Sequence, residues 1–331
     1  MKTTYLSSGV NIEAGDEAVR RIKGLVRETF SPNVVTDIGS FGGCFEFPTL
    51  PYKQPVLVSS MDGVGTKLIV ARLMKHHDTV GQCLVNHCVN DILTVGARPL
   101  FFLDYIGLGI LKPDIVVEII QGLVTACKEN HCSLIGGEMA EMPDIYRKKD
   151  YDLVGTIIGI VEREQMLPRK VQAGDILIGL PSNGLHTNGY SLARKVLFKD
   201  HQATDYISEI GGVLGDVLLR IHRSYLNVVL PLLEDADLHA ISHITGGGIV
   251  GNTIRVIPAG LKLQIDWDAW EWPSLFNYIQ RQGEVDVEEM RHVFNLGIGL
   301  ILIVNSNAVQ RLLTDLRASG EEPIIIGQIN Y

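Results

Sequence analysis

The sequence predicts an α/β protein of two domains, and three observations support this prediction. At 331 residues the chain is long enough for roughly two domains, each with its own core. Short apolar runs typical of buried strands alternate with longer stretches in which apolar residues recur at helical spacing. A polar segment with proline and glycine, residues 168–174, separates two apolar strands. We therefore expect the domains to occupy residues 1–168 and 169–331.

The composition narrows the class of protein. Hydrophobic residues make up 46% and charged residues 20%, as in compact folded proteins. A net charge of −9 without a basic stretch argues against a nucleic-acid partner. The five cysteines form no C-x-x-C pair, which favours reduced, mostly buried thiols over a disulfide framework or a zinc site. No apolar run has the length of a signal core or a membrane span, so we expect a cytoplasmic protein.

The N-terminal region contains one predicted helix and one glycine-rich segment. Apolar residues recur at helical spacing over residues 15–29, and the basic residues of the same stretch, Lys23 among them, are typical of a solvated face. Residues 37–44 contain almost no core-forming side chains. Such a segment is either a plain connector or a mobile flap over a ligand.

The stretch at residues 55–67 combines a short apolar strand with the sequence D-G-V-G-T-K. Gly63 and Gly65 would allow backbone N–H groups to approach an anion closely. Lys67 would supply a charge for phosphate, and Asp62 would supply an oxygen ligand for Mg²⁺. The alternative is a simple turn from strand to helix with a solvated acid and amine. The stretch is neither a Walker A loop nor a dinucleotide-binding fingerprint.

Acidic residues then follow the expected elements of the first domain. A broadly apolar helix at residues 79–95 carries Asn90 and Asp91, which either form a solvated stripe or face a ligand and share a metal with Asp62. The predicted strand at residues 100–106 contains one acid, Asp104, as a second candidate ligand.

A helix is predicted at residues 113–129 and strands at residues 132–135 and 151–161. The first of these strands is followed by a glycine pair and then by Glu138 and Glu141. Two carboxylates in that position suit cation coordination or base catalysis.

The second domain has two glycine loops that each contain a histidine. A strand at residues 175–181 leads through His186 to a helix at residues 190–198, and a strand at residues 238–244 ends in His243 before three glycines. Donor-rich loops of this kind bind oxyanions or phosphate, although a lone histidine is more often structural. A long helix is expected between these two units, over residues 214–233. Three further strands are expected, at residues 261–265, 299–304 and 323–329.

Taken together, these motifs resemble the aminoimidazole ribonucleotide synthetase family, the phosphoribosylformylglycinamidine cyclo-ligases of purine synthesis. They follow the family order along nearly the whole chain. The matching segments are residues 8–10, 41–43, 62–67, 88–91, 99–105, 136–138, 140–143, 184–192, 243–248 and 294–299.

The resemblance implies a homodimer in which the sheets of the two N-terminal domains pair, with a ferredoxin-like α/β sandwich as the C-terminal domain. It also implies ATP and Mg²⁺ as cofactors. The reaction would close the imidazole ring of formylglycinamidine ribonucleotide through an iminophosphate, giving aminoimidazole ribonucleotide, ADP and phosphate. Phosphoryl transfer of this kind requires positioning and charge neutralisation more than a covalent nucleophile.

The resemblance also suggests a role for each candidate residue. Three carboxylates would bind Mg²⁺: Asp62, Asp91 and Glu138. Residues at the ATP would be Phe41, Gly42 and Gly43 of the flap, Asp62, Gly63, Gly65, Thr66 and Lys67 of the turn, and Asn90, Asp104 and Glu141. The ribonucleotide would contact Asn188, Thr245, Gly246, Gly247 and Gly248. Proton or charge transfer would fall to Lys23, His186, His243 and Asp91.

Two departures from the family pattern leave alternatives open. Met61 and Met139 replace threonines beside the phosphate-binding motifs, and each substitution removes a hydroxyl donor. One alternative is another ATP-dependent enzyme of the same superfamily, such as a thiamine-phosphate kinase, a selenophosphate synthetase or formylglycinamidine ribonucleotide synthetase. The other is a non-catalytic nucleotide-binding paralogue.

Overall fold

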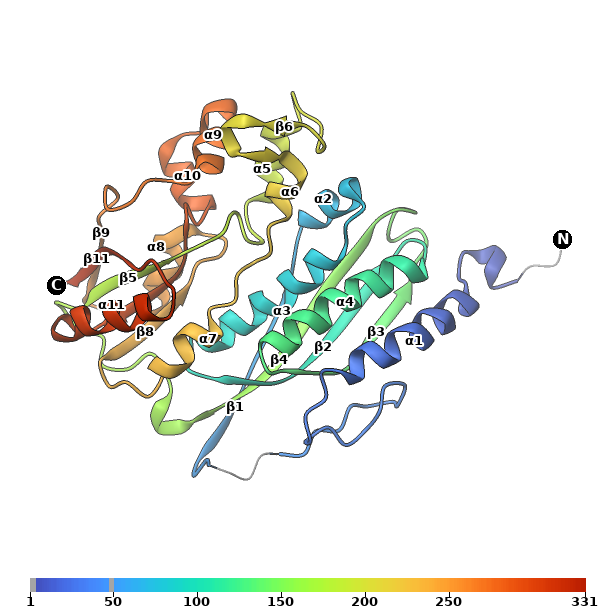
Figure 1. Cartoon of the computed structure of the whole chain (residues 1–331), viewed down its shortest axis with the longest axis horizontal. Coiled ribbons are helices and arrows are strands. Elements are labelled where there is room, and N and C mark those ends of the chain that lie inside the picture. The colour runs from blue at the N-terminus through green and yellow to red at the C-terminus, as the bar shows by residue number, and fades with distance from the viewer. Residues whose placement is uncertain (1–3, 48–50) are drawn as a thin grey trace.

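The computed structural model describes residues 4–47 and 51–331, and it contains two main sheets, one in each half of the chain (Figure 1). The first sheet has four strands in the order β1-β4-β2-β3, of which only β2 and β3 pair in parallel. Its strands are β1 (Pro55–Gly63), β2 (Arg98–Leu108), β3 (Ser133–Glu141) and β4 (Tyr151–Glu162).

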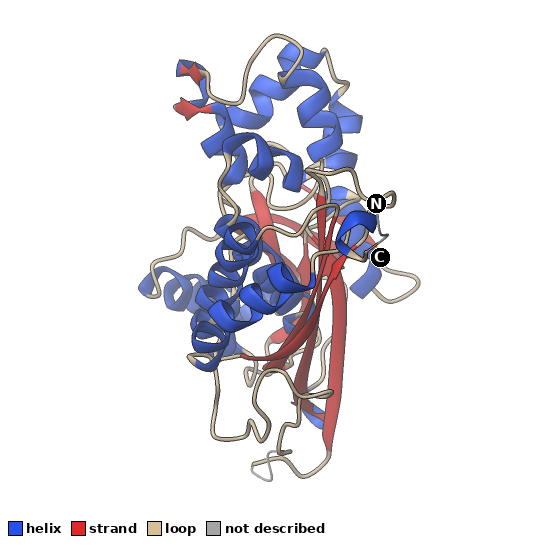
Figure 2. Ribbon diagram, turned by 90° about the vertical axis from the view of Figure 1, so that its right-hand side faces the viewer, coloured by secondary structure: helices blue, strands red, loops and turns tan. Residues whose placement is uncertain are grey.

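Helices cover one face of this sheet, as Figure 2 shows. They are α1 (Ile12–Arg27), α2 (Lys67–Met74), α3 (Asp78–Leu93) and α4 (Pro113–Glu129). Burial along β1 alternates with period two, so Ser60 and Asp62 face the helices while Leu57 and Met61 face away. Those two apolar side chains are 58% and 67% exposed. The second face of the sheet is therefore open in a single chain.

The second half contains a five-stranded antiparallel sheet in the order β8-β10-β5-β11-β9. Its strands are β5 (Ile176–Pro181), β8 (Leu238–His243), β9 (Lys262–Ile265), β10 (Ile298–Val304) and β11 (Ile324–Asn330), and a small ribbon is formed by β6 (Tyr206–Ile207) and β7 (Gly212–Val213). The helices are α5 (Tyr190–Leu197), α6 (Leu214–Leu219), α7 (Leu226–Val229), α8 (Gly248–Thr253), α9 (Ser274–Gly283), α10 (Val287–Val293) and α11 (Val309–Ala318). All seven residues of β10 are buried, as expected for a central strand.

The predicted mixed α/β class is confirmed, while the exact domain boundary stays a prediction. Two local predictions were wrong. The long helix at residues 214–233 is instead two short helices, α6 and α7, joined by an extended segment at residues 220–225. Strand β3 continues to Glu141, so the glycine pair and Glu138 lie inside the sheet and not in a loop after it.

No helix of the described ranges is both long and apolar enough to cross a bilayer.

Candidate active site

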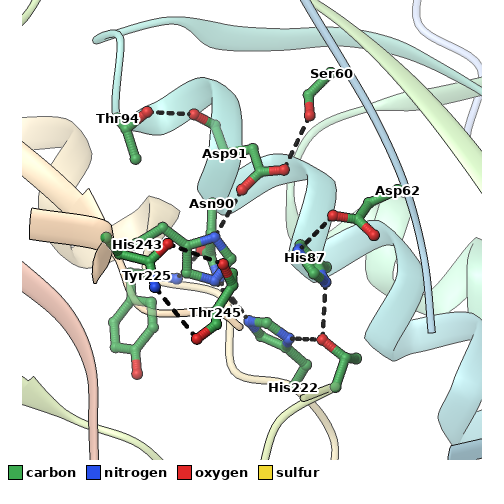
Figure 3. Close-up of polar contacts among 12 residues, drawn as sticks. Ser60, Asp62, His87, Asn90, Asp91, Thr94, His222, Tyr225, His243 and Thr245 are labelled. Atoms are coloured by element: carbon green, nitrogen blue, oxygen red, sulfur yellow. Dashed lines mark hydrogen bonds and ion pairs between the residues drawn. The ribbon is translucent and has the colours of Figure 1, made fainter. Parts of the chain in front are cut away.

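Several of the predicted residues meet where α3 packs against the second half of the chain (Figure 3). The most direct link joins Asp91 on α3 to His243 at the end of β8, with 2.8 Å between Oδ1 and Nδ1. The other carboxylate oxygen of Asp91 accepts a hydrogen bond from Ser60 at 2.9 Å. The Asp91–His243 contact joins two parts of the chain that are 152 residues apart in sequence.

The environment of this pair favours an ionised carboxylate and a neutral imidazole. Burial works to raise the pKa of Asp91, but the hydrogen bonds with His243 and Ser60 help to lower that pKa below its usual value overall. Burial lowers the pKa of His243, partly offset by Asp91. The same balance acts on Asp62. Burial works to raise its pKa, but the contact with His87 outweighs burial, and the pKa is lowered overall.

Two histidines that sequence reasoning did not select extend the site. His87 lies on α3 with its Nε2 atom 3.0 Å from Oδ2 of Asp62 and its Nδ1 atom 2.8 Å from the Thr187 hydroxyl. The Thr187 hydroxyl also lies 3.2 Å from Nδ1 of His222, and Nε2 of His222 lies 3.0 Å from Nε2 of His243. A chain of polar contacts therefore runs from one carboxylate, Asp62, to the other, Asp91.

His186 lies behind this chain of contacts. Its ring stacks on that of His222 with 4.1 Å between centroids, and burial holds its pKa well below the usual value. Neither ring nitrogen of His186 has a hydrogen-bond partner among the described residues. The structure brings His186 to the site as a neutral, enclosed ring, without direct contact to either carboxylate.

The predicted substrate residues also lie together in the second half of the chain. The loop from Thr245 to Gly248 precedes α8, and Asn252 holds it by donating to the carbonyl oxygens of Thr245, Gly246 and Gly248. A side chain at Gly246 would approach Oδ1 of Asn188 to 3.3 Å. This loop directly follows His243 and so borders the Asp91–His243 pair.

Lys67 and Asn90, which are predicted to contact ATP, have their side chains bonded to protein groups. The Lys67 amine is buried and donates to the carbonyl oxygens of His186 at 2.9 Å and Arg220 at 2.6 Å, and burial lowers its pKa. The Asn90 side chain is also buried, and it binds the backbone of Arg223 and Tyr225. Both side chains bind the second half of the chain, which covers them.

The predicted Mg²⁺ triad is not assembled within one chain. Asp62 lies on edge strand β1 and Glu138 on the opposite edge strand β3, which the strand order separates by about 14 Å. Glu138 pairs with Tyr105 on the open face of the sheet, whereas Asp62 faces the helices. Asp104 lies between them under the helices, and burial raises its pKa to about 7.

The remaining predicted residues lie near β3, away from the histidines. Lys23 on α1 pairs with Asp37 at 3.0 Å, at the far side of the molecule from the second sheet (Figure 1). Glu141 accepts hydrogen bonds from the backbone N–H groups of Asn11 and Leu111 at 2.6 and 2.7 Å. Both of its carboxylate oxygens therefore bind the backbone of this chain.

The glycines of the two glycine-rich segments in the first half are exposed or partly exposed. Phe41 is fully exposed, and Gly43 packs against Ile135 of β3. Gly63 ends β1, Gly65 has a positive φ of 55°, and the two residues form the turn into α2 that the sequence predicts. Thr66 lies next to this turn, with its hydroxyl 3.1 Å from that of Ser191.

The chain matches two family descriptions. Residues 49–161 match "AIR synthase related protein, N-terminal domain", and residues 172–330 match "AIR synthase related protein, C-terminal domain".

Relatives named phosphoribosylformylglycinamidine cyclo-ligase align over almost the whole chain. The protein of Alkaliphilus oremlandii is 44% identical over 99% of this chain and 97% of its own length. The protein of Desulfitobacterium hafniense is 46% identical over 100% of this chain and 97% of its own length. The protein of Pseudothermotoga lettingae is 47% identical over 99% of this chain and 97% of its own length.

Solved structures share the fold at much lower identity. Thiamine-monophosphate kinase from Stenotrophomonas maltophilia K279a has a TM-score of 0.70 at 16% identity, covering 93% of each chain. The hydrogenase maturation protein HypE in complex with ATP has a TM-score of 0.65 at 18% identity, covering 94% of this chain and 86% of its own. Because its full-length relatives are 44% to 47% identical, the chain belongs to the phosphoribosylformylglycinamidine cyclo-ligase family of enzymes, as its motifs predict.

Proposed function

We propose that the protein closes the imidazole ring of formylglycinamidine ribonucleotide in an ATP-dependent reaction of purine biosynthesis. The products would be aminoimidazole ribonucleotide, ADP and phosphate. The observation that carries this proposal is the Asp91–His243 pair, because it brings an ionised carboxylate and a neutral imidazole to one point beside two glycine loops. The full-length relatives favour this activity over the kinase, whose likeness supports the fold alone.

The residues at the domain junction fit Mg²⁺ bound with ATP. The side chains of Asp62 and Asp91 are 43% and 26% exposed, and both carboxyls have lowered pKa values. Ionised carboxylates with access to solvent are the ligands that Mg²⁺ takes when it also keeps waters and phosphate oxygens. When bound, Mg²⁺ would neutralise the charge on the phosphates during phosphoryl transfer.

The chain itself would bind and orient the two substrates. The turn at Gly63 and Gly65 precedes α2, and the backbone N–H of Gly65 would bind phosphate oxygens of ATP, whereas that of Gly63 donates to Oδ1 of Asp62. The loop from Thr245 to Gly248, with Asn188 beside it, would hold the ribonucleotide. His243 ends β8 just before the second loop, and burial lowers its pKa, so its imidazole would accept the proton released as the amidine nitrogen attacks.

We further propose that the enzyme is a cytoplasmic homodimer in which the open faces of the two N-terminal sheets pack together. Leu57 and Met61 expose apolar surface there, although their strand is paired with β4 along its whole length. Such a dimer would also account for the separation of the predicted residues, because Glu138 lies on the open face and Asp62 does not.

The proposal is tested by measuring ADP release with and without formylglycinamidine ribonucleotide, followed by identification of the product. We expect ADP to appear only with that substrate and to be accompanied by aminoimidazole ribonucleotide. Asp91→Asn should lower turnover at least about 100-fold while the protein stays folded, and Asp268→Asn, at an exposed site, is the matched control. ADP release with a different acceptor, or full turnover by Asp91→Asn, would overturn the proposal.

A further inference from the structure

A basic cleft lies at one end of the helical layer, where α2 ends and α4 begins (Figure 1). It encloses about 480 Å³, which is within the size range of small-molecule sites. The basic residues that line it are Arg72, Lys75, Lys112, Lys148 and Lys149. We propose that this basic cleft binds a small molecule that carries a di- or triphosphate group, at a position separate from the active site.

The basic cleft is remote from the Asp91–His243 pair. His77, which lines the cleft, directly precedes α3, whereas Asp91 lies near the other end of that helix. Because an α-helix rises 1.5 Å per residue, these two residues are about 20 Å apart. A ligand in the basic cleft would therefore leave Asp91 and His243 free.

The lysines of the basic cleft carry positive charge that the protein does not neutralise. Within the described residues, lysine ion pairs involve only Lys23 and Lys128, so the four lysines of the cleft have none. Two of the four, Lys148 and Lys149, are adjacent in the loop between β3 and β4. The chain as a whole has a net charge of −9, so this local excess of positive charge is specific to the cleft and favours an anion.

Three acidic residues also line the basic cleft, and each already has a partner in the protein. Asp150 pairs with Arg72, and Asp114 pairs with an arginine of α1 at 2.7 Å. One carboxylate oxygen of Glu118 accepts a hydrogen bond from the backbone N–H of His77 at 2.6 Å. These acids therefore offset the arginines and orient the backbone, but they do not pair with the four lysines.

A buried pair of residues in the wall of the cleft retains an unused hydrogen-bond donor. His77 and Tyr151 are 5% and 8% exposed, and Nδ1 of the histidine lies 2.8 Å from the tyrosine hydroxyl. Neither Nε2 of His77 nor the hydroxyl of Tyr151 has another hydrogen-bond partner among the described residues.

Burial lowers the pKa of His77, so the pair carries two polar hydrogens, one on the imidazole and one on the hydroxyl. Their mutual hydrogen bond uses only one of them. In one tautomer the remaining donor is Nε2–H of His77, and in the other it is the hydroxyl of Tyr151. A donor in such a wall requires an acceptor, and a phosphate oxygen would supply one.

The start of α4 adds to the attraction for an anion. This helix begins at Pro113 without a side-chain cap, and both Asp114 and Ile115 of its first turn line the basic cleft. The N-terminus of a helix carries partial positive charge and free backbone N–H groups. Ile110, which is 41% exposed, lines the same cleft and would contact an organic group attached to the phosphates.

The test is isothermal titration calorimetry of the full-length protein with inorganic tripolyphosphate, at low ionic strength and without divalent cations or substrate. Its outcome does not depend on the proposed reaction. We expect one site per chain with a dissociation constant below about 100 μM. Inorganic phosphate at the same ionic strength should bind at least about 10-fold more weakly, because it carries fewer charges.

The double variant Lys148→Ala, Lys149→Ala should weaken tripolyphosphate binding at least about 10-fold, because it removes two charged donors. The matched control is Lys195→Ala, Lys199→Ala, which removes two exposed lysines from the second half of the chain. Tyr151→Phe removes one polar hydrogen of the buried pair and should weaken binding about 3- to 10-fold.

ADP and pyrophosphate distinguish the two sources of such a phosphate group, and either result supports the site. Binding of ADP about 10-fold more tightly than pyrophosphate would assign a nucleotide that covers Ile110, whereas equal affinity would assign an inorganic polyphosphate. Asp91→Asn should bind tripolyphosphate as tightly as the wild-type protein, because it changes only the active site.

The proposal is overturned if the wild-type protein binds no tripolyphosphate below millimolar concentration. It is also overturned if the two double lysine variants bind it equally well, or if Asp91→Asn abolishes binding.

Discussion

The amine of Lys67, at the start of α2, donates to the backbone carbonyl oxygen of Arg220 at 2.6 Å, in the segment that joins α6 to α7. The same amine reaches the carbonyl of His186 at 2.9 Å and the thiol of Cys83 at 3.1 Å. A side chain that the sequence predicts at a phosphate is thus enclosed between the two halves of the chain. Its main role in this structure is to join them.

Lys67→Met should therefore destabilise the protein. The substitution would leave two buried carbonyl oxygens without a donor, and each such loss costs about 1 to 3 kcal/mol. We expect the free energy of unfolding in urea to fall by roughly 2 to 5 kcal/mol, with no such change in Lys199→Met at an exposed position. If Lys67→Met instead keeps its stability and only the KM for ATP rises, the role as a phosphate ligand would be restored.

Thr187→Val should slow the reaction without weakening substrate binding. The hydroxyl contacts both His87 and His222 and touches neither carboxylate directly, so its loss acts through the orientation of the two rings. We expect kcat to fall about 10- to 100-fold and the KM values to stay within a factor of two. Thr314→Val, which removes an exposed hydroxyl bonded only to its own helix, controls for the substitution itself. A rise in KM at constant kcat would contradict this positioning role.

The site residues that can be predicted from the sequence are those whose immediate neighbours in the chain form a recognisable pattern. Asp62, Asp91 and His243 each lie beside a strand end, a glycine loop or a polar helix face, and such features can be recognised from a short window. His87 could have been found as well, because it precedes Asp91 by four residues and so shares its face of α3.

His222 could not be found in that way, because its position depends on distant contacts. The stretch around it has the apolar pattern of a helix, but Asn86 and Asn90 bind its backbone carbonyls and hold it extended. The position of Glu138 could not be predicted from the sequence for a related reason. A glycine pair usually marks the end of a strand, yet here it continues β3 and turns Glu138 onto the open face.

The stability of the protein should depend on pH through Asp104. Burial raises the pKa of this carboxyl to about 7 in the folded state, whereas an unfolded chain has a value near 4. The folded state then binds more protons than the unfolded state between these values, so this contribution to stability is complete below about pH 4 and is lost as the pH rises through about 7.

Asp104→Asn should remove that dependence. An amide cannot ionise, so the variant should gain stability relative to wild type at pH 8, by on the order of 4 kcal/mol at most, and show little difference at pH 4. Urea unfolding at several pH values measures this directly, with the exposed Asp268→Asn as the control. An unchanged difference between the two proteins from pH 4 to pH 8 would mean that Asp104 is ionised in the folded state.

The open face of the first sheet leads to a prediction about assembly. Leu57 and Met61 lie four residues apart on the same face of β1, and both side chains are more than half exposed. If two copies pack through this face, a charge placed there would be buried against its own symmetry mate, which is strongly unfavourable. We expect the wild-type protein to sediment at twice its chain mass of 36.4 kDa and the double variant Leu57→Glu, Met61→Glu to sediment as a single chain.

The matched control is Ile254→Glu, which places the same charge on an apolar residue that is 58% exposed in the other half of the chain. This control should remain dimeric. The double variant should also lose turnover while keeping its far-ultraviolet circular dichroism, because Glu138 on the same face would no longer be near a second copy. A wild-type protein that sediments as a single chain, or a double variant that stays dimeric, would show that this face is not the interface. Dissociation with full turnover would show instead that each chain holds a complete site and that the residues near β3 take no part in the reaction.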